Sequence, residues 1–240
     1  ELLEEMVEQC AKQGTLPFPK DELLDKIRTG HSFLELAGLC FKYLGTAAYL
    51  DLMGKFFNKD FEVDRIPLSY QELLQLEVPI LLTTNYDRIP EIGSQARYQP
   101  FTNKNAADAL RAREQRKSVL IKVHGCITVH DSLVLTNDDY QRVMFRQNDL
   151  QTLLRSVFTS QTVLFLGFGL SDPHIDLLLS LLNGVFSGSV VMPVFLYTSI
   201  PISQMVIRLS DMFKLYKPLF PALVQSMPIV PLEVRPVISF

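Results

Sequence analysis

The chain has 240 residues, of which 48% are hydrophobic, and a formal net charge of −3. This length and apolar content suit one globular domain, alone or with a small appendage. The mildly acidic balance argues against nucleic acid as the main partner, because phosphate binding needs a basic face. The nearest basic cluster, which we interpret as the solvated face of a helix, is Arg111, Arg113, Arg116 and Lys117.

The first part of the chain, residues 1–57, has helical patterns. Apolar residues from Leu2 to Cys10 share one face of a helix that Gly14 ends, and a second short helix is predicted at 21–28. The stretch 31–57 is also helical in pattern, and Gly45 and Gly54 are its predicted breaks.

The pattern then changes to short runs that are apolar on both faces, at 79–84, 118–123, 162–167 and 190–197. Such runs are typical of parallel strands covered by helices. Helices are predicted between them, at 105–116, 137–158 and 173–186. The recurring order of strand, helix and strand predicts an α/β fold, with a Rossmann-like doubly wound parallel sheet, helices on both of its faces and a helical N-terminal part.

Two later stretches are harder to interpret. No charged residue occurs from Leu177 to Ile207, but glycines and prolines interrupt this run, which favours helix, turn and buried strand over a membrane span. Beyond residue 216, five prolines punctuate an apolar tail with little periodicity, and we expect it to be weakly ordered or to lean on a partner.

The cysteines Cys10, Cys40 and Cys126 are scattered and form no Cys-x-x-Cys pair. This spacing excludes a zinc ribbon and a thioredoxin-type motif, and we predict no metal. Free thiols fit a reducing cytosol, so a cytoplasmic protein is expected. Cys126 follows a His-Gly turn, where a thiol nucleophile is conceivable, but a small buried apolar role is favoured.

Polar or glycine-rich turns follow three of the predicted strands. The first is Thr83-Thr84-Asn85-Tyr86-Asp87, the second is His124-Gly125, and the third runs from Gly167 to His174. Because open α/β sheets bind ligands beyond the carboxyl ends of their strands, we expect the three turns to share one cleft.

Each turn also has a purely structural interpretation. Asn85 and Asp87 favour turns through bonds to the backbone, and a lone His124 is more often a structural histidine. In the third turn, Ser171 or Asp172 can cap a helix. We treat His130 and His174 as structural, and Thr136 with Asp139 as the cap of the next helix. The shared strand-end position favours function for the first two turns.

In motif and order, the chain resembles the sirtuin-like NAD-consuming domains of bacterial anti-phage defence. The four matching segments are Thr83–Asp87, Lys122–Gly125, Leu133–Tyr140 and Leu166–Pro173, and the resemblance covers about residues 1–190. It implies a domain at 1–190, truncated at its N-terminus, that binds and hydrolyses NAD⁺, with a poorly assigned C-terminal extension of the same domain at 191–240.

The resemblance implies a glycohydrolase that cleaves NAD⁺ to nicotinamide and ADP-ribose. His124 is then the general base, Asn85 contacts the ribose or orders the attacking water, and Asp87 accepts hydrogen bonds from the carboxamide of nicotinamide. The remaining implied NAD contacts are Thr83, Thr84, Gly167, Phe168, Gly169, Ser171 and Asp172. NAD⁺ is a substrate, and the implied partner is a homo-oligomer or an activating domain or chain.

Two departures from the family pattern keep other functions open. No Gly-Ala-Gly-x-Ser loop precedes the first helix, so an inactive nucleotide-binding or oligomerisation scaffold is the alternative. The four zinc cysteines of protein-deacetylating sirtuins are absent, which makes a protein deacylase less favoured. A conventional dehydrogenase is disfavoured, because no Gly-x-Gly-x-x-Gly fingerprint occurs.

Overall fold

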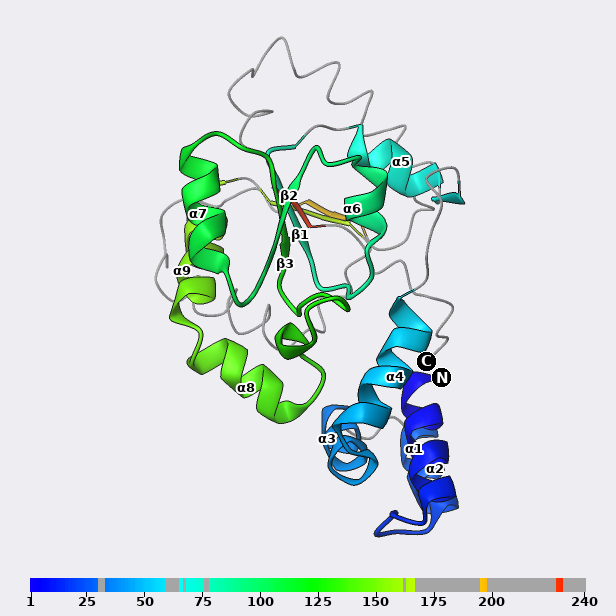
Figure 1. The fold of residues 1–240 in the computed structure, drawn as a ribbon. Coiled ribbons are helices and arrows are strands. Elements are labelled where there is room, and N and C mark those ends of the chain that lie inside the picture. Colours follow the sequence, from blue (N-terminus) through cyan, green and yellow to red (C-terminus); the bar gives the residue numbers. More distant parts are fainter. Residues whose placement is uncertain are drawn as a thin grey trace.

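The computed structural model describes residues 1–29, 33–58, 65–66, 68–75, 78–161, 163–166, 195–197 and 228–230 (Figure 1). The predicted third turn from Gly167 to His174, the predicted helix at 173–186 and most of the uncharged run from Leu177 to Ile207 therefore lie outside the described residues. Within the part of the chain that is described, no helix is both long and apolar enough to cross a membrane.

Four helices form the N-terminal part: α1 (Leu2–Gln13), α2 (Lys20–Arg28), α3 (Phe33–Leu44) and α4 (Thr46–Phe57). Gly14, with φ of 67°, ends α1 as predicted, and Gly45 separates α3 from α4. The predicted break at Gly54 is wrong, because α4 continues through it to Phe57. A glycine inside a helix costs only about 1 kcal/mol, and the buried neighbours Leu52 and Met53 offset such a cost by packing.

The described strands form one parallel sheet of six, in the order β2-β3-β1-β6-β4-β5. Four were predicted from apolar runs, namely β1 (Ile80–Thr83), β3 (Val119–Lys122), β4 (Leu164–Leu166) and β5 (Phe195–Tyr197). The edge strand β2 (Gln99–Thr102) and the central strand β6 (Pro228–Val230) were not predicted. At Pro228–Val230, the expectation of a weakly ordered tail is wrong, because this segment pairs with both β1 and β4.

Helix α5 (Leu68–Leu74) precedes β1, and the other described helices connect the strands: α6 (Ile89–Gly93), α7 (Ala106–Glu114), α8 (Asn137–Phe145) and α9 (Asn148–Ser160), with a 3₁₀ turn at His130–Ser132. The prediction of a single helix at 137–158 is wrong, because the structure has two helices here: α8 ends at Phe145 and α9 begins at Asn148. Asn148 and Asp149 favour a new helix start over a helix interior. The predicted cap is confirmed, because Thr136 and Asp139 form a reciprocal capping box at the start of α8.

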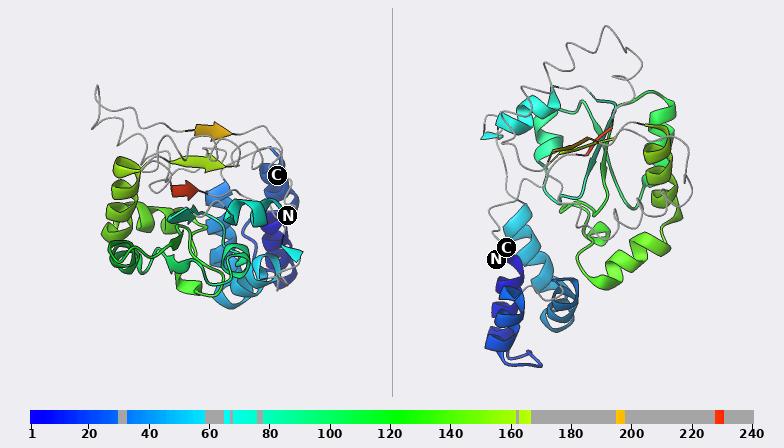
Figure 2. Two further views of the ribbon diagram at one scale, coloured as in Figure 1. Left: turned by 90° about the horizontal axis from the view of Figure 1, so that it is seen from above. Right: turned by 180° about the vertical axis from the view of Figure 1, so that it is seen from behind.

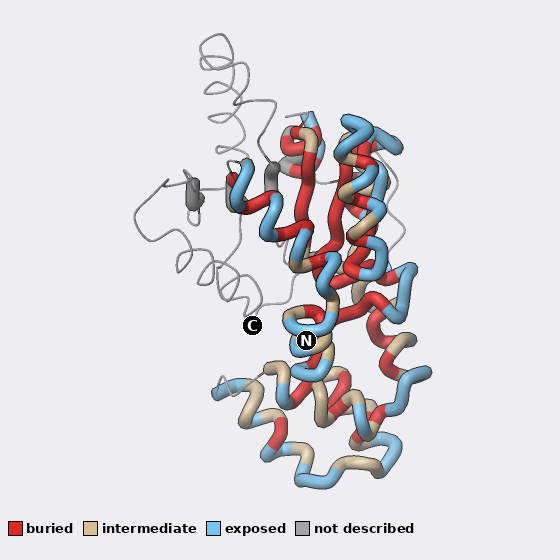
Figure 3. The backbone as a smooth tube through the Cα atoms, turned by 90° about the vertical axis from the view of Figure 1, so that its left-hand side faces the viewer, coloured by how far each residue is buried: buried red, intermediate tan, exposed pale blue. Residues whose placement is uncertain are grey.

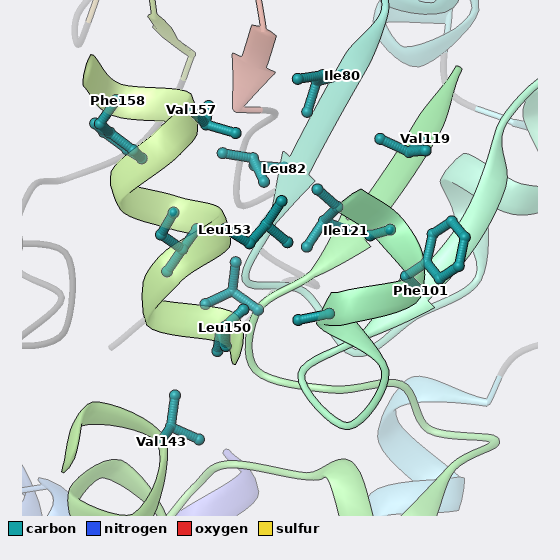
Figure 4. Packing of buried hydrophobic residues seen from close by; sticks show 14 of the residues in the cluster. Ile80, Leu82, Phe101, Val119, Ile121, Val143, Leu150, Leu153, Val157 and Phe158 are labelled. Carbon is teal, nitrogen blue, oxygen red and sulfur yellow. The ribbon is translucent and has the colours of Figure 1, made fainter. Parts of the chain in front are cut away.

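Helices cover both faces of the sheet, as predicted: α7 and α9 lie on one face and α5 and α6 on the other (Figure 1). The main core is on the first of these faces, where alternate strand residues Ile80, Leu82, Val119 and Ile121 pack against apolar residues of α9 (Figure 4). The residues between them, Leu81 and Leu120, are also buried, so the central strands are buried on both sides (Figure 3).

A second apolar cluster joins α1–α4 to the segment that follows β3. It contains residues from all four helices together with Ile127, Leu133 and Leu135. The helices are grouped at one end of the sheet, as Figure 2 shows. Since Ile127 lies just beyond the carboxyl end of β3, the helical part packs at the edge where we expect the site.

Candidate functional site

Strand register brings the first two turns side by side. In the parallel pair of β1 and β3, Thr83 lies opposite Lys122, and the N–H of Val123 donates to the carbonyl of Thr83 at 2.9 Å. Asn85 and His124 each follow two residues after these partners. Because β4 is parallel to the other strands, it also ends at this edge. The chain passes from the β3 side of β1 to the β4 side here, which is where doubly wound sheets bind ligands.

The first turn, Thr83–Asp87, is held largely by its own side chains. Thr83 is fully buried, and its Oγ1 accepts the N–H of Asn85 at 3.0 Å. Asp87 Oδ1 accepts the N–H of Ile89 at 2.8 Å, which fixes the start of α6. Both bonds are the turn contacts that the structural interpretation expects, so they orient the turn without excluding a role in binding.

The polar side chains of the first turn meet a buried tyrosine and a buried charge. Asn85 Nδ2 donates to the hydroxyl of Tyr70 at 3.5 Å, which is a long contact. Burial raises the pKa of Asp87, and the nearby positive charge of Lys122 opposes that rise. Burial thus favours the protonated acid, whereas Lys122 favours the carboxylate, the form that accepts hydrogen bonds from an amide.

Tyr86, between the two candidate residues, links the first turn to the segment after the second. Its carbonyl accepts the N–H of Ile127 at 2.9 Å, and its hydroxyl donates to the carbonyl of Val134 at 2.5 Å. Its ring packs edge-on against Phe57 of α4, with centroids 5.1 Å apart. We predicted no role for Tyr86 from the sequence, although its position inside the Thr83–Asp87 motif could have indicated one.

The second turn centres on a buried histidine. His124 is 4% exposed, and its ring meets Tyr140 of α8 edge to face at 5.1 Å between centroids. Its carbonyl accepts the N–H of Val134 at 3.1 Å. Gly125 has φ of 91°, and a Cβ there would collide with the backbone carbonyl of Ser132. Only glycine therefore fits the turn beside His124.

A buried asparagine from the neighbouring strand end holds the second turn. Asn103 follows β2 and is 3% exposed; its Nδ2 donates to the carbonyls of Val123, at 3.0 Å, and Ser132, at 2.7 Å. Ser132 Oγ in turn accepts the N–H of Cys126 at 3.0 Å. Sequence analysis missed Asn103, because the strand that places it was not predicted.

A buried ion pair lies beneath both turns. Lys122, the last residue of β3, is 1% exposed; its Nζ donates to the carbonyl of Asp87 and lies 3.0 Å from Glu91 Oε1. Cys126 is also buried, with its Sγ 3.2 Å from Thr128 Oγ1 and 3.7 Å from Glu91 Oε1. A lysine at the end of an apolar run was the signal that could have marked this pair.

Some of the remaining candidate residues lie in the described part of the chain, and others lie outside it. Thr84 is partly exposed beside Thr83, and His130 is exposed. Gly167, Phe168, Gly169, Ser171, Asp172 and His174 lie outside the described residues. In the described ranges, no group of three or more His, Cys, Asp or Glu side chains is arranged to hold a metal ion.

Comparisons with known proteins identify the family of the chain. The family model described as "SIR2-like domain" matches residues 79–225. The chain is 27% identical over 171 residues to "NAD(+) hydrolase ThsA" of Cytobacillus dafuensis, a match that covers 70% of the chain and 34% of that protein. It is 24% identical over 169 residues to "Defense-associated sirtuin 2" of Bacillus subtilis, covering 69% of the chain and 16% of that protein.

A third relative, "NAD(+) hydrolase ThsA" of Bacillus cereus, is 28% identical over 119 residues, which is 49% of the chain and 25% of the relative. The chain thus spans about a third or less of the length of these curated relatives. The family model, by contrast, matches more than half of the chain and includes both turns of the candidate site. The chain therefore belongs to the family of SIR2-like domains.

Proposed function

We propose that this domain is an NAD⁺ glycohydrolase, which cleaves NAD⁺ to nicotinamide and ADP-ribose. The observation that carries the proposal is the register of β1 and β3, which sets the Asn85–Asp87 turn beside His124 at the carboxyl edge of the sheet. Relatives named as NAD(+) hydrolases support the choice of substrate.

The reaction needs a water molecule, a held ribose and an oriented leaving group. Water attacks C1′ of the nicotinamide ribose while the bond from C1′ to the ring nitrogen breaks, and that electron pair neutralises the nicotinamide ring. The transition state resembles an oxocarbenium ion, as in glycoside hydrolysis. The proton lost by water passes to a base, so the products are nicotinamide, ADP-ribose and one proton.

The proposed roles follow from the two turns. His124 is the base that accepts the proton of water, and Asn85 orients that water or the ribose. Asp87 accepts the N–H groups of the nicotinamide carboxamide, and Thr83 and Thr84 line the same turn. We also assign Gly167, Phe168, Gly169, Ser171 and Asp172 to contacts with NAD⁺, because β4 ends at the same edge of the sheet.

We further propose that the domain is an anti-phage defence effector, as the name of one relative suggests. Its three scattered cysteines favour action without zinc and in the cytoplasm. An effector that consumes NAD⁺ needs restraint until it is triggered, so we expect a homo-oligomer or a partner to activate it. A boundary near residue 190 between the domain and its extension stays a prediction.

The test is nicotinamide release from NAD⁺ by the protein as its gene encodes it. We expect His124→Ala and Asn85→Ala to abolish release while each variant keeps the wild-type melting temperature within a few degrees. His130→Ala is the matched control, because this exposed histidine lies on the segment that follows the same turn. Its release should equal that of the wild type.

Retained turnover in both site variants would refute the site assignment. Tight NAD⁺ binding by calorimetry, without release under any activating condition, would refute the glycohydrolase and support the alternative of a catalytically inactive nucleotide-binding scaffold. Loss of binding in His124→Ala and Asn85→Ala would still place the nucleotide at the two turns.

A further inference from the structure

We propose that Lys122 is a positioning residue. It joins the first turn to β3 and favours the negative charge of Asp87, the residue assigned to the nicotinamide end of the site. The inference rests on the proposed function for its catalytic meaning. Its structural part, the hold of Lys122 on Asp87, stands on contacts of the described residues alone.

The contacts of Lys122 reach three elements of the site. The residue ends β3, two positions before His124, and its register partner on β1 is Thr83. Its Nζ donates to the backbone carbonyl of Asp87 in the first turn and lies 3.0 Å from Glu91 Oε1 on α6. The ammonium group therefore connects the first turn to the helix that follows it, and the backbone carbonyl of Lys122 accepts the N–H of Gly125 in the second turn at 3.1 Å.

This pair is poorly suited to a purely structural role. Lysine is almost never fully buried, and a buried ion pair is often no better for stability than apolar residues of similar volume. Oε2 of Glu91 is buried without a hydrogen-bond partner in the described part of the chain, so the pair is not fully satisfied. An incompletely satisfied charge beneath a candidate site favours a functional reason for its place.

The ionisable groups around Asp87 act on the protonation of its carboxyl group in opposite senses. Among the described residues, three ionisable groups act on this carboxylate from the elements packed against it: Tyr70 on α5, Glu91 on α6 and Lys122 on β3. Burial and the charge of Glu91 favour the protonated acid, whereas Lys122 favours the carboxylate. Without Lys122, Asp87 would keep its proton to a higher pH and would no longer accept two hydrogen bonds from a carboxamide.

The test compares Lys122→Met with Glu91→Gln, two variants of nearly unchanged side-chain size. In Lys122→Met, the acid limb of the pH profile for nicotinamide release should move up by about one pH unit, and kcat should fall about 10- to 100-fold. In Glu91→Gln, the acid limb should move down, because a negative charge near Asp87 is lost. A general loosening of the site would move both variants the same way.

Titration of Asp87, followed through the ¹³C signal of its carboxyl group, gives the same comparison without any turnover. Absence of release by the wild type would refute the proposed function, while this titration would still decide the inference. If Lys122→Met does not fold, Lys122→Gln takes its place in the titration, because it also removes the positive charge beside Asp87 and its amide can still donate to the carbonyl of Asp87.

Lys104→Met is the matched control, because Lys104 forms an exposed ion pair with Asp131 beyond the neighbouring strand β2. It should leave both the pH profile and the titration of Asp87 unchanged. The inference is overturned if Asp87 titrates alike in the wild type and in the folded variants, or if the two variants shift it in the same direction.

Discussion

The two turns that form the candidate site are held in different ways. The first, Thr83–Asp87, is fixed by bonds from its own threonine and aspartate to backbone N–H groups two residues away. The second, His124–Gly125, is fixed by groups from other segments, namely Asn103, Ser132 and Val134. The position of His124 therefore depends on the β2 end and on the loop after β3, whereas the first turn combines its local bonds with contacts of Asp87 to Lys122 and of Tyr86 to Ile127 and Val134.

Gly125→Ala should have the largest effect on stability among changes at the two turns. The substitution adds strain at φ of 91° and a collision with the carbonyl of Ser132, whose carbon and oxygen are backbone atoms that cannot move aside cheaply. We expect a loss of about 3 kcal/mol or more in the free energy of unfolding, measured by urea denaturation.

Gly14→Ala is the control, because Gly14 has φ of 67° but open space where a Cβ would lie. It should cost about 1 kcal/mol. Equal losses for the two variants would mean that backbone conformation alone, rather than the contact with Ser132, determines the need for glycine at the second turn.

Asn103→Ala should be the next most costly change. It leaves the buried carbonyls of Val123 and Ser132 without a donor, which we expect to cost about 2–3 kcal/mol in urea denaturation. Asn105→Ala is the matched control: Asn105 is exposed and accepts the N–H of Thr102 at 2.7 Å, so its loss should cost about 1 kcal/mol. Nearly equal losses of stability in the two variants would contradict the conclusion that Asn103, from a different strand end, holds the second turn in place.

The difference between local contacts and contacts from distant segments also explains which features the sequence could predict. The strands β1 and β3 and the capping box at Thr136 follow from apolar runs and from neighbouring residues, and all three were predicted. Turn residues such as Asn85 and Asp87 carry their own signal, because their side chains bond to nearby backbone. The motif and family order then added His124.

What escaped prediction depends on pairing between distant segments. The edge strand β2 begins with the exposed pair Gln99-Pro100, a polar residue and a proline, and so lacks the apolar run that marked the others. Strand β6 starts with a proline in an apolar tail, and its partners are β1 and β4. The contacts of Lys122 and Asn103 arise only once β1, β2 and β3 are aligned; the lysine at the end of an apolar run could mark Lys122 as unusual, but no local pattern names the partners of either residue.

Thr83→Val should have the smallest effect on stability and a larger one on the proposed activity. The change keeps the side-chain volume in a fully buried site but removes the oxygen that accepts the N–H of Asn85. Asn85 is only partly buried, so water can take over its N–H, and we expect a loss of about 1 kcal/mol in urea denaturation. Nicotinamide release should fall further than this, because the turn that orients Asn85 loses its anchor.

Thr102→Val supplies the control for that comparison, since Thr102 on β2 pairs with Lys122 from the side opposite Thr83. Its loss of stability should be similar, because its Oγ1 also accepts a nearby N–H, that of Lys104 at 3.3 Å. Its effect on release should be smaller, because it does not contact Asn85. If both threonine variants lowered nicotinamide release equally, the activity would depend on the whole strand edge. The bond from Asn85 to Thr83 would then have no specific effect on activity, and the comparison between the two turns would fail.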